Sequence, residues 1–261
     1  MSSLTITLIQ TNLFWENKKA NLEMLQQKIE GIKEKTEIVI LPEMFTTGFS
    51  MKPELFAETM DGETVQWMEK TAAEKKIILT GSVIIEEDGK YFNRLIWMLP
   101  NGEYGMYDKR HLFAFADEHA HYTAGNKKLI ASVKGWKINL QICYDLRFPV
   151  WTRQDSENKY DLLINVANWP EKRNIAWQTL LRARAIENQC FVAGVNCTGE
   201  DGNKIYYSGE SMLIDPTGEI IYQKKKEEDI FTTTLQKEKI TETRERFPFW
   251  KDADFFILKD L

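Results

Sequence analysis

The chain has 261 residues, 43% hydrophobic and 28% charged, so it can bury a full core in one large domain or two small ones. A net charge of −5 excludes long-range attraction to nucleic acid or anionic membranes. The cysteines at 143, 190 and 197 fit neither a disulfide framework nor a zinc site. Without a signal-peptide pattern or an apolar run of roughly 18 residues, we expect a cytoplasmic protein with reduced thiols that binds neither nucleic acid nor membrane.

Apolar runs of strand length alternate with helical patterns along the first part of the chain. In chain order we expect a strand at 4–10, a helix at 17–33, a strand at 38–41, a helix at 63–75, strands at 77–85, 94–99, 138–143 and 161–168, a helix at 173–188, and strands at 190–196 and 211–216. Several runs are apolar on both faces, which is typical of strands buried on both sides. Hairpin signals appear at 87–90, 100–103 and 215–219.

These elements predict an α/β fold. We expect two mixed sheets covered by helices, in four layers. No repeat, low-complexity tract or linker divides the sequence, so residues 1–261 are expected to form a single domain. The one long irregular stretch, 109–128, begins with Lys109, and a loop of this length in a compact domain usually has a function.

Cys143 directly follows an apolar run, in the stretch "LQICYDLRFP". Alone, such a cysteine is more often an inert small side chain than a nucleophile. In α/β folds, however, reactive groups gather beyond the carboxyl ends of strands, and Glu43 and Lys109 follow strands near 38–41 and 104–107. A thiol without a histidine partner needs another base and another positive charge, which a carboxylate and an ammonium can supply. Taken singly, Glu43 could be a helix-start acid and Lys109 a solvated loop charge.

Three segments in this order, "LPEMFTTGF", "YDKRHLF" and "ICYDLRFP", resemble the Glu, Lys and Cys motifs of the nitrilase (carbon–nitrogen hydrolase) superfamily. The segment "WQTLLRARAIENQCFVAGVN" resembles the part that follows them in that family. The resemblance implies an α-β-β-α sandwich, a catalytic triad of Glu43, Lys109 and Cys143, and a homodimer or an assembly of dimers. It implies no metal and no cofactor.

Within the superfamily, "PEMFTTGFSM", "KRHLFAFADEHAHYTAGN" and "NVANWPEKRNIAW" look most like the bacterial omega-amidase group, which hydrolyses 2-oxoglutaramate and 2-oxosuccinamate. Glu118 stands where the family has a second glutamate, which implies a role in positioning the lysine and the substrate. Amide hydrolysis would proceed through a Cys143 thioester, with the oxyanion held by Lys109 and the backbone N–H of Tyr144. Alternatives are a broader aliphatic amidase, an N-carbamoyl hydrolase, or a catalytically silent interaction module.

An omega-amidase must also hold the carboxylate of a 2-oxo acid, which calls for an arginine or for oriented N–H groups. Arg173 and Arg147 are the candidates, although Arg147 could instead brace the site and Arg173 could lie in solvent. Trp169 and Phe45 are expected to wall the pocket, although either could be plain core. The three histidines in the loop 109–128 lack a matching set of acidic or cysteine ligands, so we expect no metal site.

Overall fold

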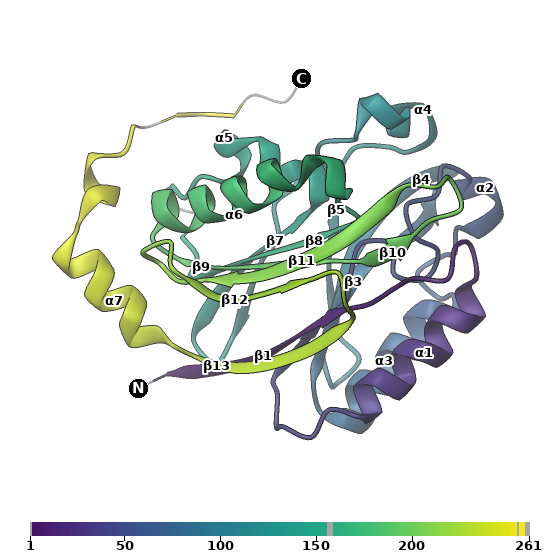
Figure 1. The fold of residues 1–261 in the computed structure, drawn as a ribbon, viewed down its shortest axis with the longest axis horizontal. Helices are drawn as coiled ribbons and strands as arrows, with labels where there is room; N and C mark the ends of the chain where they lie inside the picture. Colours follow the sequence, from purple (N-terminus) through teal and green to yellow (C-terminus); the bar gives the residue numbers. More distant parts are fainter. Residues whose placement is uncertain (1, 156–158, 255, 259–261) are drawn as a thin grey trace.

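The computed structural model describes residues 2–155, 159–254 and 256–258. Two mixed β-sheets pack face to face, with helices on both outer sides (Figure 1). The first sheet contains, in spatial order, β13 (Asp229–Gln236), β1 (Ser3–Gln10), β2 (Ile38–Ile40), β3 (Ile78–Glu87), β4 (Lys90–Met98) and β5 (Tyr104–Asp108). The second contains β10 (Thr198–Glu200), β11 (Tyr206–Ile214), β9 (Phe191–Asn196), β8 (Leu162–Ala167), β7 (Trp136–Ile142) and β6 (Ile130–Val133), with β12 (Ile220–Lys225) also paired to β11.

Helices complete the outer layers. On the first sheet lie α1 (Lys18–Glu30) and α3 (Glu63–Lys75), and on the second lies α6 (Asn174–Asn188) (Figure 1). The shorter helices are α2 (Pro53–Phe56), α4 (Glu118–His121), α5 (Pro149–Thr152) and α7 (Lys237–Arg246), and 3-10 turns cover Ala114–Ala116, Cys143–Arg147, Glu171–Arg173 and Phe249–Asp252. The predicted four-layer α-β-β-α sandwich is therefore confirmed.

The period-two geometry of strands explains why both faces of these strands are apolar. In β2, Ile38 and Ile40 point into the cluster between the sheets, whereas Val39 points toward α1 and α3. In β8, Leu162 and Ile164 likewise face the other sheet, whereas Leu163 packs under α6. Three hydrophobic layers thus separate the four layers of secondary structure.

The three predicted hairpins join β3 to β4, β4 to β5 and β11 to β12. The strands β6, β10, β12 and β13 and the helix α7 were not predicted as separate elements. The loop 109–128 contains only a 3-10 turn and the four-residue α4, in agreement with its irregular sequence. No helix within the described part of the chain has the length and apolar character required to span a bilayer.

Candidate active site

Three strand ends bring the predicted triad residues to one edge of the two sheets. Glu43 lies three residues beyond β2, Lys109 directly follows β5, and Cys143 directly follows β7. The Cys143 backbone has φ of 43°, a left-handed conformation that is strained for a non-glycine residue. The turn that begins there is anchored by the Asp145 carboxylate, which accepts hydrogen bonds from Ile142 N at 3.1 Å and from the Tyr107 hydroxyl at 2.7 Å.

Lys109 lies between two buried carboxylates. Its Nζ donates to Glu43 Oε1 at 2.9 Å and to both oxygens of Glu118, at 3.0 and 2.9 Å. All three side chains are inaccessible to solvent. Asn93, on β4, adds a donor to Glu43 Oε1 at 2.8 Å. Two negative charges and one positive charge thus form a fixed and fully hydrogen-bonded cluster.

A fourth strand end fixes the orientation of Glu43. Asn168 follows β8, and its backbone N–H donates to Glu43 Oε2 at 2.8 Å. The Asn168 side-chain amide donates to the Glu43 carbonyl oxygen at 2.7 Å. Each carboxylate oxygen of Glu43 therefore has a donor, and these contacts restrict its rotation.

Burial and the charges of this cluster both act on the pKa of the Cys143 thiol. Burial disfavours the Lys109 ammonium, but Glu118 and Glu43 outweigh that effect and raise the pKa of Lys109. Burial raises the pKa of Glu118; Lys109 offsets part of that shift, and the charge of Glu43 adds to it. Burial and the charge of Glu43 hold the pKa of Cys143 well above its usual value, and Lys109 counters this only in part. In the free protein Cys143 is therefore a thiol, and Glu43 is the neighbouring carboxylate.

Cys143 opens into a cavity that also contains both candidate arginines. The guanidinium of Arg147 lies over the Trp169 ring at 4.9 Å, and that of Arg173 lies over the Phe113 ring at 5.0 Å. Among the described residues neither arginine forms an ion pair with a carboxylate. The remaining lining side chains are mostly apolar or aromatic and include Phe49, Tyr144, Pro170, Ile205 and Tyr207. The cavity therefore presents two positive charges in apolar surroundings, which suits a small anionic molecule.

Phe45 does not occupy the predicted position. It is fully buried between the first sheet and the helices α1 and α3, 5.9 Å from the Trp67 ring between ring centres. A Cβ on Gly81 would lie only 2.8 Å from the Phe45 ring, which shows how closely the ring packs against β3. The chain turns after Glu43, and Phe45 points away from the cavity that Trp169 lines.

Asn93 and Asn168 were not predicted as site residues. Asn168 follows an apolar strand, so a polar side chain at a strand end was a usable signal. Asn93 lies within β4, where only its polar character in a buried strand marked it. His111 stacks on Phe148 at 3.7 Å and hydrogen-bonds to Asp145 at 2.8 Å. Within the described ranges no cluster of three His, Cys, Asp or Glu side chains could hold a metal.

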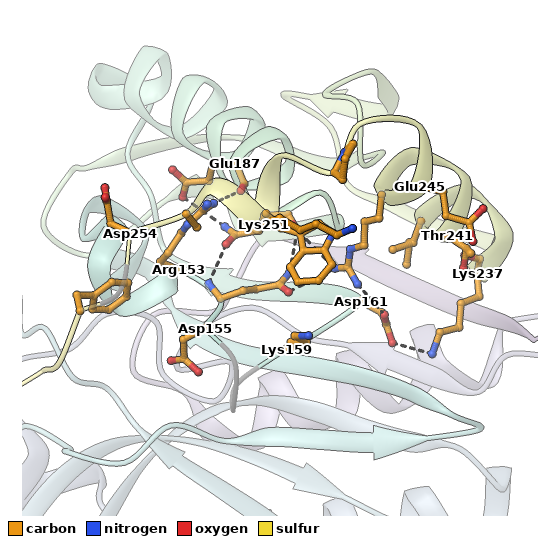
Figure 2. A pocket seen from close by; sticks show the side chains of 18 residues that line it. Arg153, Asp155, Lys159, Asp161, Glu187, Lys237, Thr241, Glu245, Lys251 and Asp254 are labelled. Atoms are coloured by element: carbon orange, nitrogen blue, oxygen red, sulfur yellow. Dashed lines mark hydrogen bonds and ion pairs between the residues drawn. The ribbon is translucent and has the colours of Figure 1, made fainter.

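A cavity of about 760 Å³ lies elsewhere, between α7, the end of α6 and the C-terminal segment (Figure 2). It is lined by equal numbers of acidic and basic side chains. Asp161 forms ion pairs with Lys237 at 2.9 Å and with Arg244 at 3.6 Å. None of Glu43, Lys109 and Cys143 lines this cavity. The candidate active site is therefore the cavity lined by Cys143 and not this larger one.

Comparison with known proteins agrees with this geometry. Residues 5–245 match the carbon-nitrogen hydrolase family. The chain is 44% identical to the omega-amidase YafV of Escherichia coli K12, over 99% of this chain and 100% of that protein. It is 34% identical to the 2-oxoglutaramate amidase of Bacillus subtilis, over 98% of each. A solved structure of a CN-hydrolase superfamily protein from Xanthomonas campestris, with an arsenic adduct in its active site, matches with a TM-score of 0.96 and 44% identity, covering 99% of this chain and 100% of that one. The chain belongs to the carbon–nitrogen hydrolase family.

Proposed function

We propose that this protein is an omega-amidase that hydrolyses the terminal amide of 2-oxoglutaramate or 2-oxosuccinamate to the 2-oxo acid and ammonia. The observation that carries this proposal is the cavity at Cys143, where a thiol beside a buried Glu–Lys–Glu cluster shares an apolar space with two arginines. The full-length relatives named omega-amidase and 2-oxoglutaramate amidase support the same substrate class.

In the first half of the reaction Glu43 accepts the Cys143 proton, and the sulfur attacks the amide carbon. The tetrahedral oxyanion forms between the Lys109 ammonium and the backbone N–H of Tyr144. Protonated Glu43 then donates its proton to the amide nitrogen, and the carbon–nitrogen bond breaks. Ammonia departs, and the substrate remains bound to Cys143 as a thioester. Because the resting thiol holds its proton tightly, proton transfer to Glu43 accompanies the attack.

In the second half a water molecule takes the place that ammonia left. Glu43, again a carboxylate, accepts a proton from this water as its oxygen attacks the thioester carbon. The carbon–sulfur bond breaks, the thiol regains a proton, and the 2-oxo acid leaves. Glu118 keeps Lys109 in place through both halves, because it binds the ammonium with both carboxylate oxygens.

A panel of amides tests the proposed function. We expect ammonia release from 2-oxoglutaramate to exceed that from glutamine, asparagine, N-carbamoyl-β-alanine and a simple nitrile. Preference for N-carbamoyl-β-alanine or for simple aliphatic amides would favour the N-carbamoyl hydrolase or the broader aliphatic amidase. No turnover of any of these compounds would leave the catalytically silent interaction module as the better account.

We expect Arg173→Ala to weaken binding of the substrate carboxylate. Arg173 is half-buried at the start of α6 and lines the cavity without a carboxylate partner. Its loss should raise KM for 2-oxoglutaramate by roughly 10–100-fold, for a charge-assisted contact worth about 1.5–3 kcal/mol. Steady-state kinetics should show little change for a neutral amide. Lys172→Ala, which removes an exposed neighbouring cation, is the matched control. An equal increase in KM for charged and neutral amides would show that Arg173 does not bind the carboxylate. Arg147 or backbone N–H groups would then have to bind it.

We also propose that residues 1–261 form one hydrolase domain that works in the cytoplasm as a homodimer or a larger assembly. The expected contact comprises the helix that contains 174–187 and the segment after Cys143. Exposed apolar side chains on those elements, Ile175, Ile186 and Val150, support it. Sedimentation at micromolar concentration should show a species of twice the 30.5 kDa chain mass or more. A single monomeric species would refute the assembly.

A further inference from the structure

Glu210 is a buried carboxylate that the proposed chemistry does not use. It lies in β11 at a bulge, with Gly209 and Glu210 both in left-handed conformations, φ of 70° and 61°. Glu210 is completely inaccessible to solvent. The bulge is held against β1, because Ser211 N donates to Gln10 Oε1 at 2.8 Å and a Cβ on Gly209 would overlap the Gln10 amide. A strained, charged residue at such a position calls for a reason beyond packing.

The Glu210 carboxylate is bound from two sides. On one side lie Ser208 and two residues of β12, with Gln223 Nε2 at 3.1 Å and the Lys225 ammonium at 3.2 Å. On the other side lies the start of α6. The Oε1 of Glu210 accepts a hydrogen bond from Asn174 Nδ2 at 2.7 Å, and its Oε2 accepts one from the Gln178 side-chain amide. The Glu210 carbonyl oxygen accepts from Trp177 Nε1 at 2.7 Å. Asn174 directly follows Arg173, so the carboxylate fixes the helix turn that carries the proposed substrate-binding arginine.

A second branch from the same bulge leads to Trp169. Asn196 donates from Nδ2 to the carbonyl oxygens of Gly209 and Trp169, at 2.6 and 2.9 Å, and its Oδ1 accepts from Trp169 N at 2.7 Å. Trp169 Nε1 in turn donates to the Arg173 carbonyl oxygen at 2.9 Å. Both ends of the segment 169–173 are therefore held by one bulge in β11.

We propose that Glu210 is a positioning residue that sets substrate specificity by fixing Arg173 and Trp169 at the edge of the cavity. The proposal rests on the proposed function, since it assumes that Arg173 binds the substrate carboxylate. Among the described residues Glu210 forms no hydrogen bond or ion pair with Glu43, Lys109 or Cys143. Its bonds to Asn174 and Gln178 hold the turn of α6 that directly follows Arg173, and Arg173 lines the cavity. Its loss should therefore change recognition of the anionic end of the substrate and leave the reacting groups in place.

The test is Glu210→Gln, which keeps the shape of the side chain but places an amide N–H₂ against the donors of α6. We expect KM for 2-oxoglutaramate to rise about 10-fold, equivalent to about 1.4 kcal/mol, with kcat little changed. The same compound with its carboxylate esterified has no charge for Arg173 to bind. Its KM should therefore change by less than about two-fold. Combined with Arg173→Ala, the Glu210 change should add almost nothing, because both act on one contact.

Asp215→Asn is the matched control for a purely structural carboxylate. Asp215 is also buried, directly after β11, but it accepts from the Thr217 and Glu219 N–H groups of its own turn and pairs with Lys239 of α7 at 3.0 Å. Its substitution should lower the melting temperature and leave the ratio of the two KM values unchanged. If Glu210→Gln does not fold, Asn174→Ala can be used instead. It removes the hydrogen bond between Asn174 and Glu210 from the α6 side and should give the same shift in KM.

The outcomes separate the two proposals. If the wild-type protein does not hydrolyse 2-oxoglutaramate, or hydrolyses the ester equally well, both the proposed function and the role of Glu210 are refuted. If wild type shows the preference but folded Glu210→Gln or Asn174→Ala keeps it, only the role of Glu210 is refuted. An increase in KM that is equal for acid and ester would make Glu210 structural and would also refute it.

Discussion

Cys143→Ala should abolish ammonia release while leaving the fold intact. A nucleophile and its base act as a unit, so removing the sulfur should lower kcat by roughly 10⁴-fold or more. The Cys143 side chain is small and only partly buried, and alanine removes no ion pair. We therefore expect circular dichroism and the melting temperature to stay close to those of wild type. An active Cys143→Ala protein would rule out the covalent mechanism.

Chemical labelling distinguishes Cys143 from the other two thiols. Cys190 and Cys197 are almost inaccessible to solvent, and neither lines the cavity at Cys143. Cys143 lies at the cavity and has Glu43 as a proton acceptor. A thiol-directed reagent followed by peptide mass spectrometry should therefore modify residue 143 first. Faster modification of Cys190 or Cys197 would count against Cys143 as the nucleophile.

Lys109→Met should remove both activity and much of the stability of the protein. It leaves Glu43 and Glu118 buried without their shared cation, and an uncompensated buried charge costs about 3–5 kcal/mol. Denaturant unfolding measures that loss. Lys70→Ala is the control, because Lys70 is exposed and its 3.9 Å pair with Glu74 should be worth less than about 1 kcal/mol. Adding Glu118→Gln to Lys109→Met should restore part of the stability but no activity.

The pH dependence of Lys109→Met gives a second measurement. Without the ammonium, burial and the charge of Glu43 raise the folded-state pKa of Glu118 further above its value in the unfolded chain. The folded state then binds more protons than the unfolded state, so stability falls as pH rises through this range. The difference in unfolding free energy between wild type and variant should therefore shrink as the pH is lowered. A loss of stability independent of pH would show that Lys109 acts by packing alone.

The motifs around Glu43, Lys109 and Cys143 could be read from sequence because each directly follows an apolar strand. Parallel strands end at the same edge of a sheet, and two such sheets packed together bring four strand ends into one place. The side chain of Phe45 could not be placed, because the turn after Glu43 decides which way it points. The pairing of β13 with β1, and of Ser3 with Gln236 within it, joins strands that lie more than 200 residues apart and has no local signal.

The sequence marks Asn168 as a polar residue at a strand end, but it does not show that Asn168 and Asn93 hydrogen-bond to Glu43. Asn93 reaches Glu43 across 50 residues, and Asn168 reaches it across 125. Both are common polar residues, and only the register of β4 and β8 decides that they face a carboxylate. The bulge at Glu210 depends in the same way on a tertiary contact, because Gly209 packs against Gln10 of the other sheet.

The most direct test of the mechanism is a rapid-quench experiment with 2-oxoglutaramate, followed by mass spectrometry of the intact protein and its peptides. We expect an early covalent adduct on Cys143. Its mass should exceed that of the free protein by the mass of the substrate minus that of ammonia, and one ammonia should be released for each adduct. The adduct should disappear as the 2-oxo acid is formed and should be absent from Cys143→Ala. Turnover of the substrate by wild type with no adduct at any quench time, or an adduct on another residue, would contradict this mechanism.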